Sequence, residues 1–148
     1  MAREFGVEGR VGFTGFVPDA AAAMRALDVV VHASTEPEPF GLVIAEAMAC
    51  GRAVVASRAG GAAEIFTEGA DALGHGPGDA PALAACIARL AESPELRLAL
   101  GRAARETAVR RFDRARLAAE LVPVYREARE VGRESKRAER MEEVLSGE

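Results

Sequence analysis

Aromatic residues and lysine are scarce in this chain. Its 148 residues include no tryptophan and one tyrosine, and aromatic residues make up 5% of the whole. Eighteen of the nineteen basic residues are arginines, which alternate with glutamates instead of clustering, and the net charge is −4. A nucleic-acid surface needs gathered cations and aromatic rings on which bases stack. The composition therefore argues against a nucleic-acid partner.

Long apolar runs are also lacking. No stretch approaches the roughly 18–20 apolar residues that cross a bilayer, and residues 1–6 do not resemble a secretory signal. The only two cysteines, Cys50 and Cys86, lie in apolar helical patterns. We expect free, buried thiols in a reducing compartment, with a disulfide between them as the less favoured alternative. These features predict a cytoplasmic protein.

The chain does contain enough apolar residues, 49%, to bury the core of one domain. In the first half, short apolar or β-branched runs alternate with helical patterns, which predicts βαβ units and a parallel sheet. The predicted strands cover residues 11–16, 28–33, 53–57 and, weakly, 70–76. The predicted helices cover residues 20–27, 41–50 and 62–67. The expected fold class is α/β, with a Rossmann-like parallel sheet flanked by helices.

The pattern after residue 77 is helical alone. Asp79 is predicted to cap a helix over 80–92, which a second helix follows as far as residue 111. Pro123 should kink or break a third helix. The last segment is rich in arginine and glutamate, typical of a solvated helix that frays to a disordered end. We predict a Rossmann-like domain over residues 1–125 and a charged helical or disordered tail over 126–148.

The most informative stretch begins at Glu38 and ends at Glu46. From Gly41 to Cys50 the chain reads as a helix that is apolar on nearly every face, with Glu46 as its one charge. Such a helix is typical of a protein interior, so we expect Glu46 to be buried with it. A buried carboxylate is costly without partners. Glu46 must therefore accept hydrogen bonds or face a wet cleft.

The residues before this helix favour the cleft. Pro37, Pro39 and Gly41 interrupt the chain, which leaves backbone amides at the helix start free to meet an anion. Helical side chains lean toward the N-terminus, so Glu46 points back at the same opening, and Glu38 stands on its near side. The sequence predicts a phosphate-sized site between two acids.

Each of these residues also has a plainer interpretation. Glu46 could be a structural acid, and Glu38 an ordinary loop carboxylate. Asp19 could be a helix-start residue only, and Gly60-Gly61 a bare turn instead of a turn that lets backbone approach a ligand. His32, at a strand end, could line the cleft or sit satisfied in the core. The sequence leaves these alternatives open.

The order of motifs resembles a known family. Gly15-Phe16-Val17-Pro18-Asp19, then Glu38-Pro39-Phe40-Gly41 with Glu46, then Gly60-Gly61 and Glu64, is similar to the donor-binding half of retaining nucleotide-sugar glycosyltransferases of family 4. These enzymes have the GT-B fold of two facing Rossmann-like domains. The similarity covers about residues 5–125, and its strongest part is the pair of glutamates with Phe-Gly between them.

The resemblance implies a role for each matching position. The acid at Glu46 would accept hydrogen bonds from the ribose hydroxyls, and the acid at Glu38, the expected catalytic residue, would lie against the donor sugar. Gly60 and Gly61 would let backbone approach the donor. Val17 and Asp19 would lie along the nucleoside. The backbone amides expected to face the pyrophosphate are those of Phe40, Gly41, Leu42 and Val43.

The implied reaction is transfer of a glycosyl group from a nucleoside-diphosphate sugar to an acceptor, with retention. The resemblance implies no metal and no other cofactor, in keeping with a chain that has no Asp-x-Asp and only His32 and His75 as imidazole ligands. The alternative is a non-catalytic nucleotide-binding, phosphate-binding or assembly module.

The chain also departs from the family pattern. Two upstream βα units, with the Gly-Arg segment and lysine that clamp the pyrophosphate, have no counterpart in it, and neither has the acceptor-binding domain. We therefore expect an N-terminally truncated enzyme whose partners are the NDP-sugar donor and the missing acceptor domain or another subunit. The two absent strands would leave a gap in the sheet, which predicts self-association.

Overall fold

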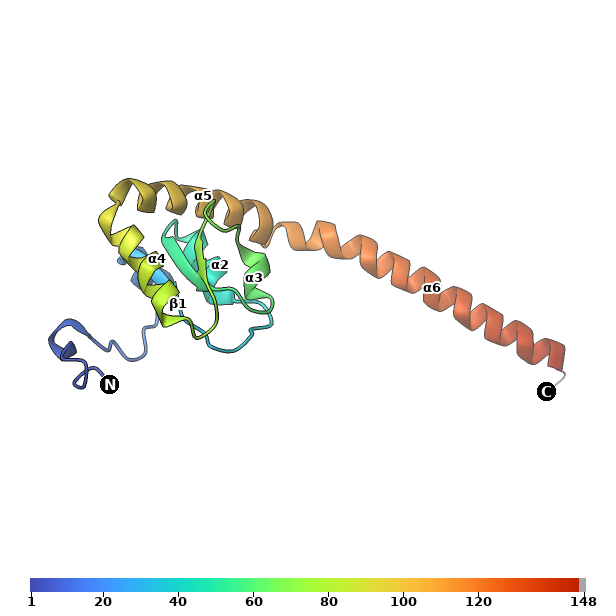
Figure 1. Ribbon diagram of the computed structural model, residues 1–148. Coiled ribbons are helices and arrows are strands. Elements are labelled where there is room, and N and C mark those ends of the chain that lie inside the picture. The colour runs from blue at the N-terminus through green and yellow to red at the C-terminus, as the bar shows by residue number, and fades with distance from the viewer. Residues whose placement is uncertain (147–148) are drawn as a thin grey trace. The chain divides into compact units, whose positions relative to one another are not determined.

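The computed structural model describes residues 1–146, and describes side chains as far as residue 135 (Figure 1). The chain forms two compact units, Met1–Val109 and Arg110–Glu148. The first unit holds the sheet and most of the helices. The second consists of the end of one helix and the long helix after it.

The sheet of the first unit has three parallel strands in chain order. They are β1 (Val29–His32), β2 (Ala53–Ser57) and β3 (Leu73–His75), with β2 in the centre. In the register, Val30 lies opposite Val54, and Val55 lies opposite Leu73. The predicted α/β class and parallel sheet are confirmed.

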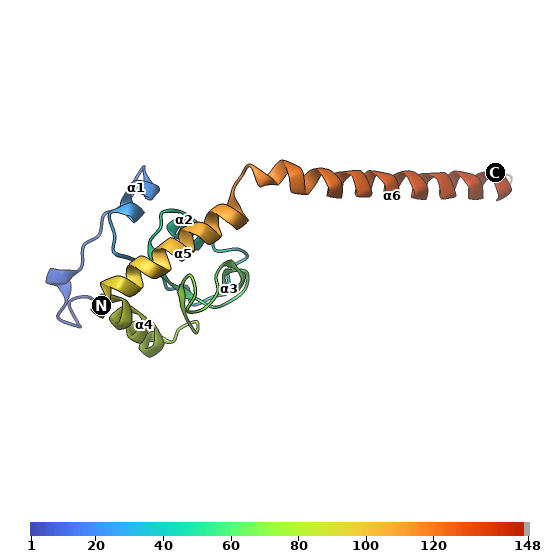
Figure 2. The ribbon, with the colours of Figure 1, turned by 90° about the horizontal axis from the view of Figure 1, so that it is seen from above.

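Helices surround these strands, as Figure 1 shows. The helix α2 contacts β1 and β2, α3 contacts β2, and α4 contacts β2 and β3. In Figure 2, α5 crosses the same unit beside α4. The helical elements are η1 (Glu8–Arg10), α1 (Ala20–Arg25), α2 (Leu42–Ala49), α3 (Ala62–Ile65), α4 (Ala80–Glu92), α5 (Pro94–Phe112) and α6 (Arg116–Ser146).

The core lies on both faces of β2, all five of whose residues are buried. Val55 and Leu73 pack with Leu90 of α4 and Leu100 of α5. Because successive side chains of a strand point to opposite faces, the fully buried Val54 shows that the second face is covered too. A strand covered on both faces is typical of a parallel sheet.

The predicted strand over residues 11–16 is wrong. This segment has no regular structure, and Phe13 and Phe16 are each 91% exposed. A strand persists only where a neighbouring backbone accepts and donates its hydrogen bonds. Among the described residues, neither the segment nor the outer edge of β1 has such a neighbour. The apolar and glycine alternation alone therefore does not make a strand here.

The C-terminal unit also differs from expectation in detail. α6 begins at Arg116, after a turn in which the Asp113 Oδ1 accepts a hydrogen bond from Ala115 N at 2.8 Å. Of the kink or break predicted at Pro123, the break is excluded, because α6 continues through this residue; the kink stays a prediction. The last two residues of the predicted tail, 147 and 148, lie outside the described residues.

The two cysteines are free thiols, as predicted, but both are half-buried instead of buried. The Sγ of Cys86 donates to Gly74 O at 3.7 Å, and burial raises the pKa of the Cys86 thiol. The Sγ of Cys50 donates to Ala21 O at 3.7 Å. The surroundings of Cys86 therefore do not activate its thiol.

A buried carboxylate fastens α5 to the loop before β3. Asp71 is 5% exposed, and its Oδ1 accepts from Thr67 N at 2.7 Å while its Oδ2 accepts from Thr107 Oγ1 at 2.8 Å. We expect Thr107→Val to lower the free energy of unfolding by about 1–3 kcal/mol, because it removes a donor from a buried charged acceptor. Urea unfolding followed by circular dichroism measures this change.

The matched control is Thr67→Val. Thr67 is exposed and reaches Asp71 through its backbone amide, which the substitution keeps. Its stability should therefore equal that of the wild type. A Thr107→Val variant as stable as this control would show that the buried hydrogen bond contributes nothing net.

Candidate functional site

The loop between β1 and α2 is held against the Gly60–Gly61 turn by direct backbone contact. Gly61 N donates to Glu38 O at 2.8 Å, and Glu38 forms a parallel bridge with Gly60. A Cβ at Gly60 would lie 2.5 Å from Glu38 O, and one at Gly61 would lie 2.0 Å from Pro39 O. Both positions therefore require glycine. The close approach that the two glycines allow is to the chain's own loop.

This contact fixes where α2 begins. Gly41 precedes the helix in the left-handed region, at a φ of 96°, and no side chain caps the helix. The first amide with a helical partner is that of Ile44, which donates to Gly41 O at 3.0 Å. The amides of Leu42 and Val43 come before it and have no partner among the described residues. Such amides, with the positive end of the helix dipole, form an anion site.

The start of α2 faces solvent. Phe40 is 46% exposed, Leu42 62% and Val43 45%. Ile44, which contacts the position of Gly41, is fully buried. The helix therefore has one buried side, formed by Ile44, Ala45, Ala47 and Met48. The opposite side presents the three exposed apolar residues and the uncapped amides.

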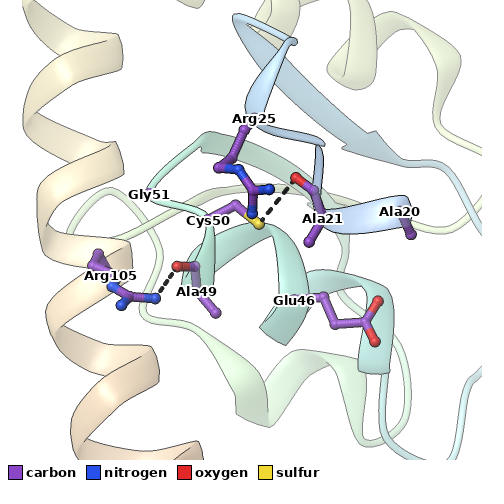
Figure 3. Close-up of a pocket in the computed structure, with 8 residues that line it drawn as sticks. All are labelled: Ala20, Ala21, Arg25, Glu46, Ala49, Cys50, Gly51 and Arg105. Atoms are coloured by element: carbon purple, nitrogen blue, oxygen red, sulfur yellow. Dashed lines mark hydrogen bonds between the residues drawn. The ribbon is translucent and has the colours of Figure 1, made fainter. Parts of the chain in front are cut away.

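Glu46 lies on this exposed side, so the prediction that it is buried with the helix is wrong. A helix that is apolar all round is buried only where other elements cover every side, and on this side the neighbouring α1 leaves Glu46 open to solvent. Of the two alternatives for Glu46, the structure gives the wet cleft. Figure 3 shows its carboxylate pointing away from Arg25.

Glu46 lines a pocket of about 580 Å³ between α1, α2 and α5 (Figure 3). At its far end Arg105 donates a hydrogen bond to Ala49 O, at the C-terminus of α2. The pocket therefore extends from Glu46 along α2, away from the helix start. Its lining residues are Ala20, Ala21, Arg25, Glu46, Ala49, Cys50, Gly51 and Arg105.

Glu38 is held beside the end of β1. Its Oε1 lies 3.0 Å from Nε2 of His32, and its side chain is 37% exposed while His32 is buried. The side-chain contacts of Glu38 with His32 and, to a smaller extent, with Ser34 lower the pKa of the Glu38 carboxyl, because they favour its ionised form. Glu38 therefore stays ionised at more acidic pH than a free glutamate does.

The remaining predicted residues lie before α1. Val17 is half-exposed, and the Oδ1 of Asp19 accepts from Ala22 N at 2.8 Å, which makes Asp19 the cap of α1. The helix that follows contributes Ala20 and Ala21 to the pocket of Glu46. The structure thus joins α1 to Glu46, while the loop contact joins Glu38 and Phe40 to the Gly60–Gly61 turn.

The sequence missed two kinds of site residue. Ser34 acts on Glu38, which lies four positions further along the loop, and a serine just past a strand end was the one available signal. Arg25 and Arg105 line the pocket from α1 and α5, and nothing in their sequence surroundings marks them. Within the described residues, no group of three His, Cys, Asp or Glu side chains is placed to hold a metal ion. The described helices include none long and apolar enough to span a bilayer.

Comparison with known proteins decides the family. Residues 1–107 match the family described as "Glycosyl transferases group 1". The chain belongs to this family. Glycosyltransferases that resemble it include the D-inositol 3-phosphate glycosyltransferase of Corynebacterium glutamicum (strain R), which is 40% identical over 133 residues. That match covers 86% of this chain and 31% of the relative.

Solved structures of group 1 transferases and other GT-B enzymes share its fold. Anabaena HepE, crystallised in complex with UDP, is 37% identical with a TM-score of 0.83, and the match covers 85% of this chain and 35% of HepE. The same protein has been crystallised with UDP-glucose. The C-terminal domain of LpcC from Francisella tularensis is 29% identical with a TM-score of 0.68, covering 75% and 58% of the two chains.

These matches confirm the resemblance found in the sequence. The chain has the fold of the GT-B glycosyltransferases and fits a C-terminal domain of that fold. It spans about a third of the length of the curated relatives that it matches.

Proposed function

We propose that this chain forms the donor-binding part of a glycosyltransferase, which moves a glycosyl group from a nucleoside-diphosphate sugar to an acceptor with retention of configuration. The observation that carries the proposal is the uncapped, exposed start of α2, with Glu38 before it and the exposed Glu46 after it in the chain. HepE, a structural neighbour, binds UDP and UDP-glucose, which supports a nucleotide-sugar donor.

The proposed roles follow from charge and position. The amides of Leu42 and Val43, with the dipole of α2, would bind the pyrophosphate and stabilise the negative charge that develops on it as the leaving group. Glu46, which is exposed one turn further along α2, would accept hydrogen bonds from the ribose hydroxyls. Glu38, kept ionised by His32 and Ser34, would lie against the donor sugar.

Three other parts of the proposal rest on the sequence. The acceptor would bind to a facing domain or another subunit. No metal would be needed, because the helix start supplies the positive potential and the chain has no Asp-x-Asp. We place the protein in the cytoplasm, where thiols such as Cys50 and Cys86 stay reduced.

A second candidate is a non-catalytic nucleotide-binding or assembly module. It would use the same uncapped helix start to hold a nucleotide or phosphate without transferring a sugar. Titration of the chain with UDP-glucose, GDP-mannose and ADP-glucose separates the two. The donor-binding proposal expects saturable binding of one of them, with amide shift changes at Leu42 and Val43 in NMR spectra. No binding at millimolar ligand would leave the assembly module.

We also propose that the chain self-associates through β1. In the described part of the chain, β1 pairs only with β2, and Val31 in its centre is 40% exposed. An unpaired edge strand without charge or proline pairs readily with another chain. Sedimentation velocity should show a dimer or larger species that grows with protein concentration. A single monomeric species across the range would contradict this expectation.

A further inference from the structure

We propose that His32 is a positioning residue for Glu38. Its buried imidazole holds the Glu38 carboxylate in one orientation at the carboxyl edge of the sheet. This orientation sets the affinity of the site for the sugar of the donor. The role in sugar binding rests on the proposed function. The contact between the two side chains does not.

Both backbones of this pair are fixed by neighbouring elements. His32 is the last residue of β1 and lies opposite Ala56 of β2 in the register. Glu38 is fixed by the bridge to Gly60 and by the hydrogen bond from Gly61 N. The two side chains therefore meet because β2 and the turn after it place them, and not because they are close in sequence.

The end of β1 is also tied to β3. The Nε2 of His75 lies 3.3 Å from His32 O, and the Nδ1 of His75 lies 2.8 Å from Gly76 O. His75 is itself buried. The imidazole of His32 is thus carried on a strand end that cannot shift without breaking contacts to β3. A rigid support of this kind is what a positioning residue needs.

The imidazole of His32 has Glu38 as its one polar neighbour within the described side chains. His32 is 8% exposed, its Nε2 lies 3.0 Å from Glu38 Oε1, and its Nδ1 is buried with no hydrogen-bond partner in the described part of the chain. The Nε2 contact is a close polar contact that lies outside the geometry of a straight hydrogen bond. Burying a polar ring that makes a single polar contact costs desolvation free energy. That contact is to the acid proposed to meet the sugar.

The charged groups around the pair set the direction of its pH dependence. Glu38 faces His32 and Ser34, and His32 faces Glu38, with His75 touching only its carbonyl. His32 has the largest share in lowering the pKa of Glu38. A carboxyl whose pKa is lowered by folding stabilises the fold above its unfolded pKa, and this stabilisation is lost as the pH falls through the folded pKa.

The first test needs no ligand. The Glu38 carboxyl is titrated by ¹³C NMR in the wild type, in His32→Leu and in His32→Gln, which keeps an N–H donor. We expect the pKa of Glu38 to rise toward its ordinary value in His32→Leu, and to rise less in His32→Gln. Equal Glu38 titration curves in the wild type and His32→Leu would overturn the proposal.

A second measurement applies if His32→Leu does not fold. The ring ¹⁵N resonances of His32 are compared at fixed pH in Glu38→Gln and in Glu36→Gln, an exposed acid of the same loop. We expect the resonances to move in Glu38→Gln and to stay in place in Glu36→Gln. Unchanged resonances in Glu38→Gln would overturn the proposal.

The third measurement tests the sugar role. Dissociation constants for UDP-glucose and UDP are measured in the wild type and in both His32 variants. We expect His32→Leu to weaken UDP-glucose roughly tenfold and UDP little, as loss of one hydrogen bond to a charged group does, and His32→Gln to recover part of the loss. Equal weakening of both ligands would overturn the sugar role. Absence of binding by the wild type would instead overturn the proposed function and leave the NMR result standing.

Discussion

Gly61→Ala should lower the free energy of unfolding by about 3 kcal/mol. The added Cβ would lie 2.0 Å from Pro39 O and 2.7 Å from Pro39 C, which are backbone atoms that cannot turn aside. The φ of Gly61 is −61°, which alanine adopts without strain, so the loss comes from overlap alone. The loop that carries Glu38 must move away from the turn, which displaces the start of α2 as well.

Thermal unfolding followed by circular dichroism measures this effect, and we expect a fall in Tm of about 10 °C. Gly76→Ala is the matched control, because the nearest atom to its added Cβ is the Asp79 Cβ at 3.6 Å, an ordinary contact. Its Tm should change by no more than about 2 °C. If Gly61→Ala has the same Tm as this control variant, the loop and the turn are not packed as described.

Glu46→Gln should weaken nucleoside-diphosphate binding by about tenfold to a hundredfold and leave stability unchanged. Removing the charge of a carboxylate that accepts hydrogen bonds from ribose hydroxyls weakens the binding free energy by about 1.5–3 kcal/mol. Because Glu46 is exposed and lies beside a pocket, the amide should be tolerated in its place. Glu38→Gln should weaken UDP less, because Glu38 is proposed to meet the sugar.

Isothermal titration with UDP, together with urea unfolding, separates binding from stability for each variant. Glu36→Gln is the control, since Glu36 is an exposed acid of the same loop. It should bind UDP as the wild type does. Unfolding of Glu46→Gln without ligand would make Glu46 a structural residue, and unchanged UDP affinity would remove it from the site.

Elements with a complete local signal were predicted to the residue. β2 runs from Ala53 to Ser57 as expected, because an uninterrupted apolar run bounded by polar or glycine residues needs no further information. α4 runs from Ala80 to Glu92, because Asp79 caps its start, accepting from Ala82 N at 2.9 Å. In both cases the residues that define the element lie inside it or beside it.

The errors have one physical origin. The strand predicted over residues 11–16 needs a neighbouring strand, and the predicted burial of Glu46 needs an element over that side of α2. A local sequence pattern indicates which secondary structure a segment adopts when other elements pack against it. It does not indicate whether any element does so. Long-range information of this kind lies in the rest of the fold.

The contact between His32 and Glu38 could not be predicted for a related reason. The two residues are six apart across an irregular loop, and the course of that loop is set by Gly60 and Gly61, which come more than twenty residues later. In the sequence, His32, Glu38 and the Gly-Gly turn were separate features. Only the three-dimensional structure shows that the turn holds the loop in place.

The exposure of the α2 start has a kinetic consequence. Leu42, Val43 and Glu46 already stand in water, so an arriving ligand meets its partners without waiting for any segment to open. The observed rate in a stopped-flow experiment should then climb in proportion to ligand concentration and show no plateau. For the proposed phosphate site, the same openness would leave water beside the phosphates unless a second protein surface covered them.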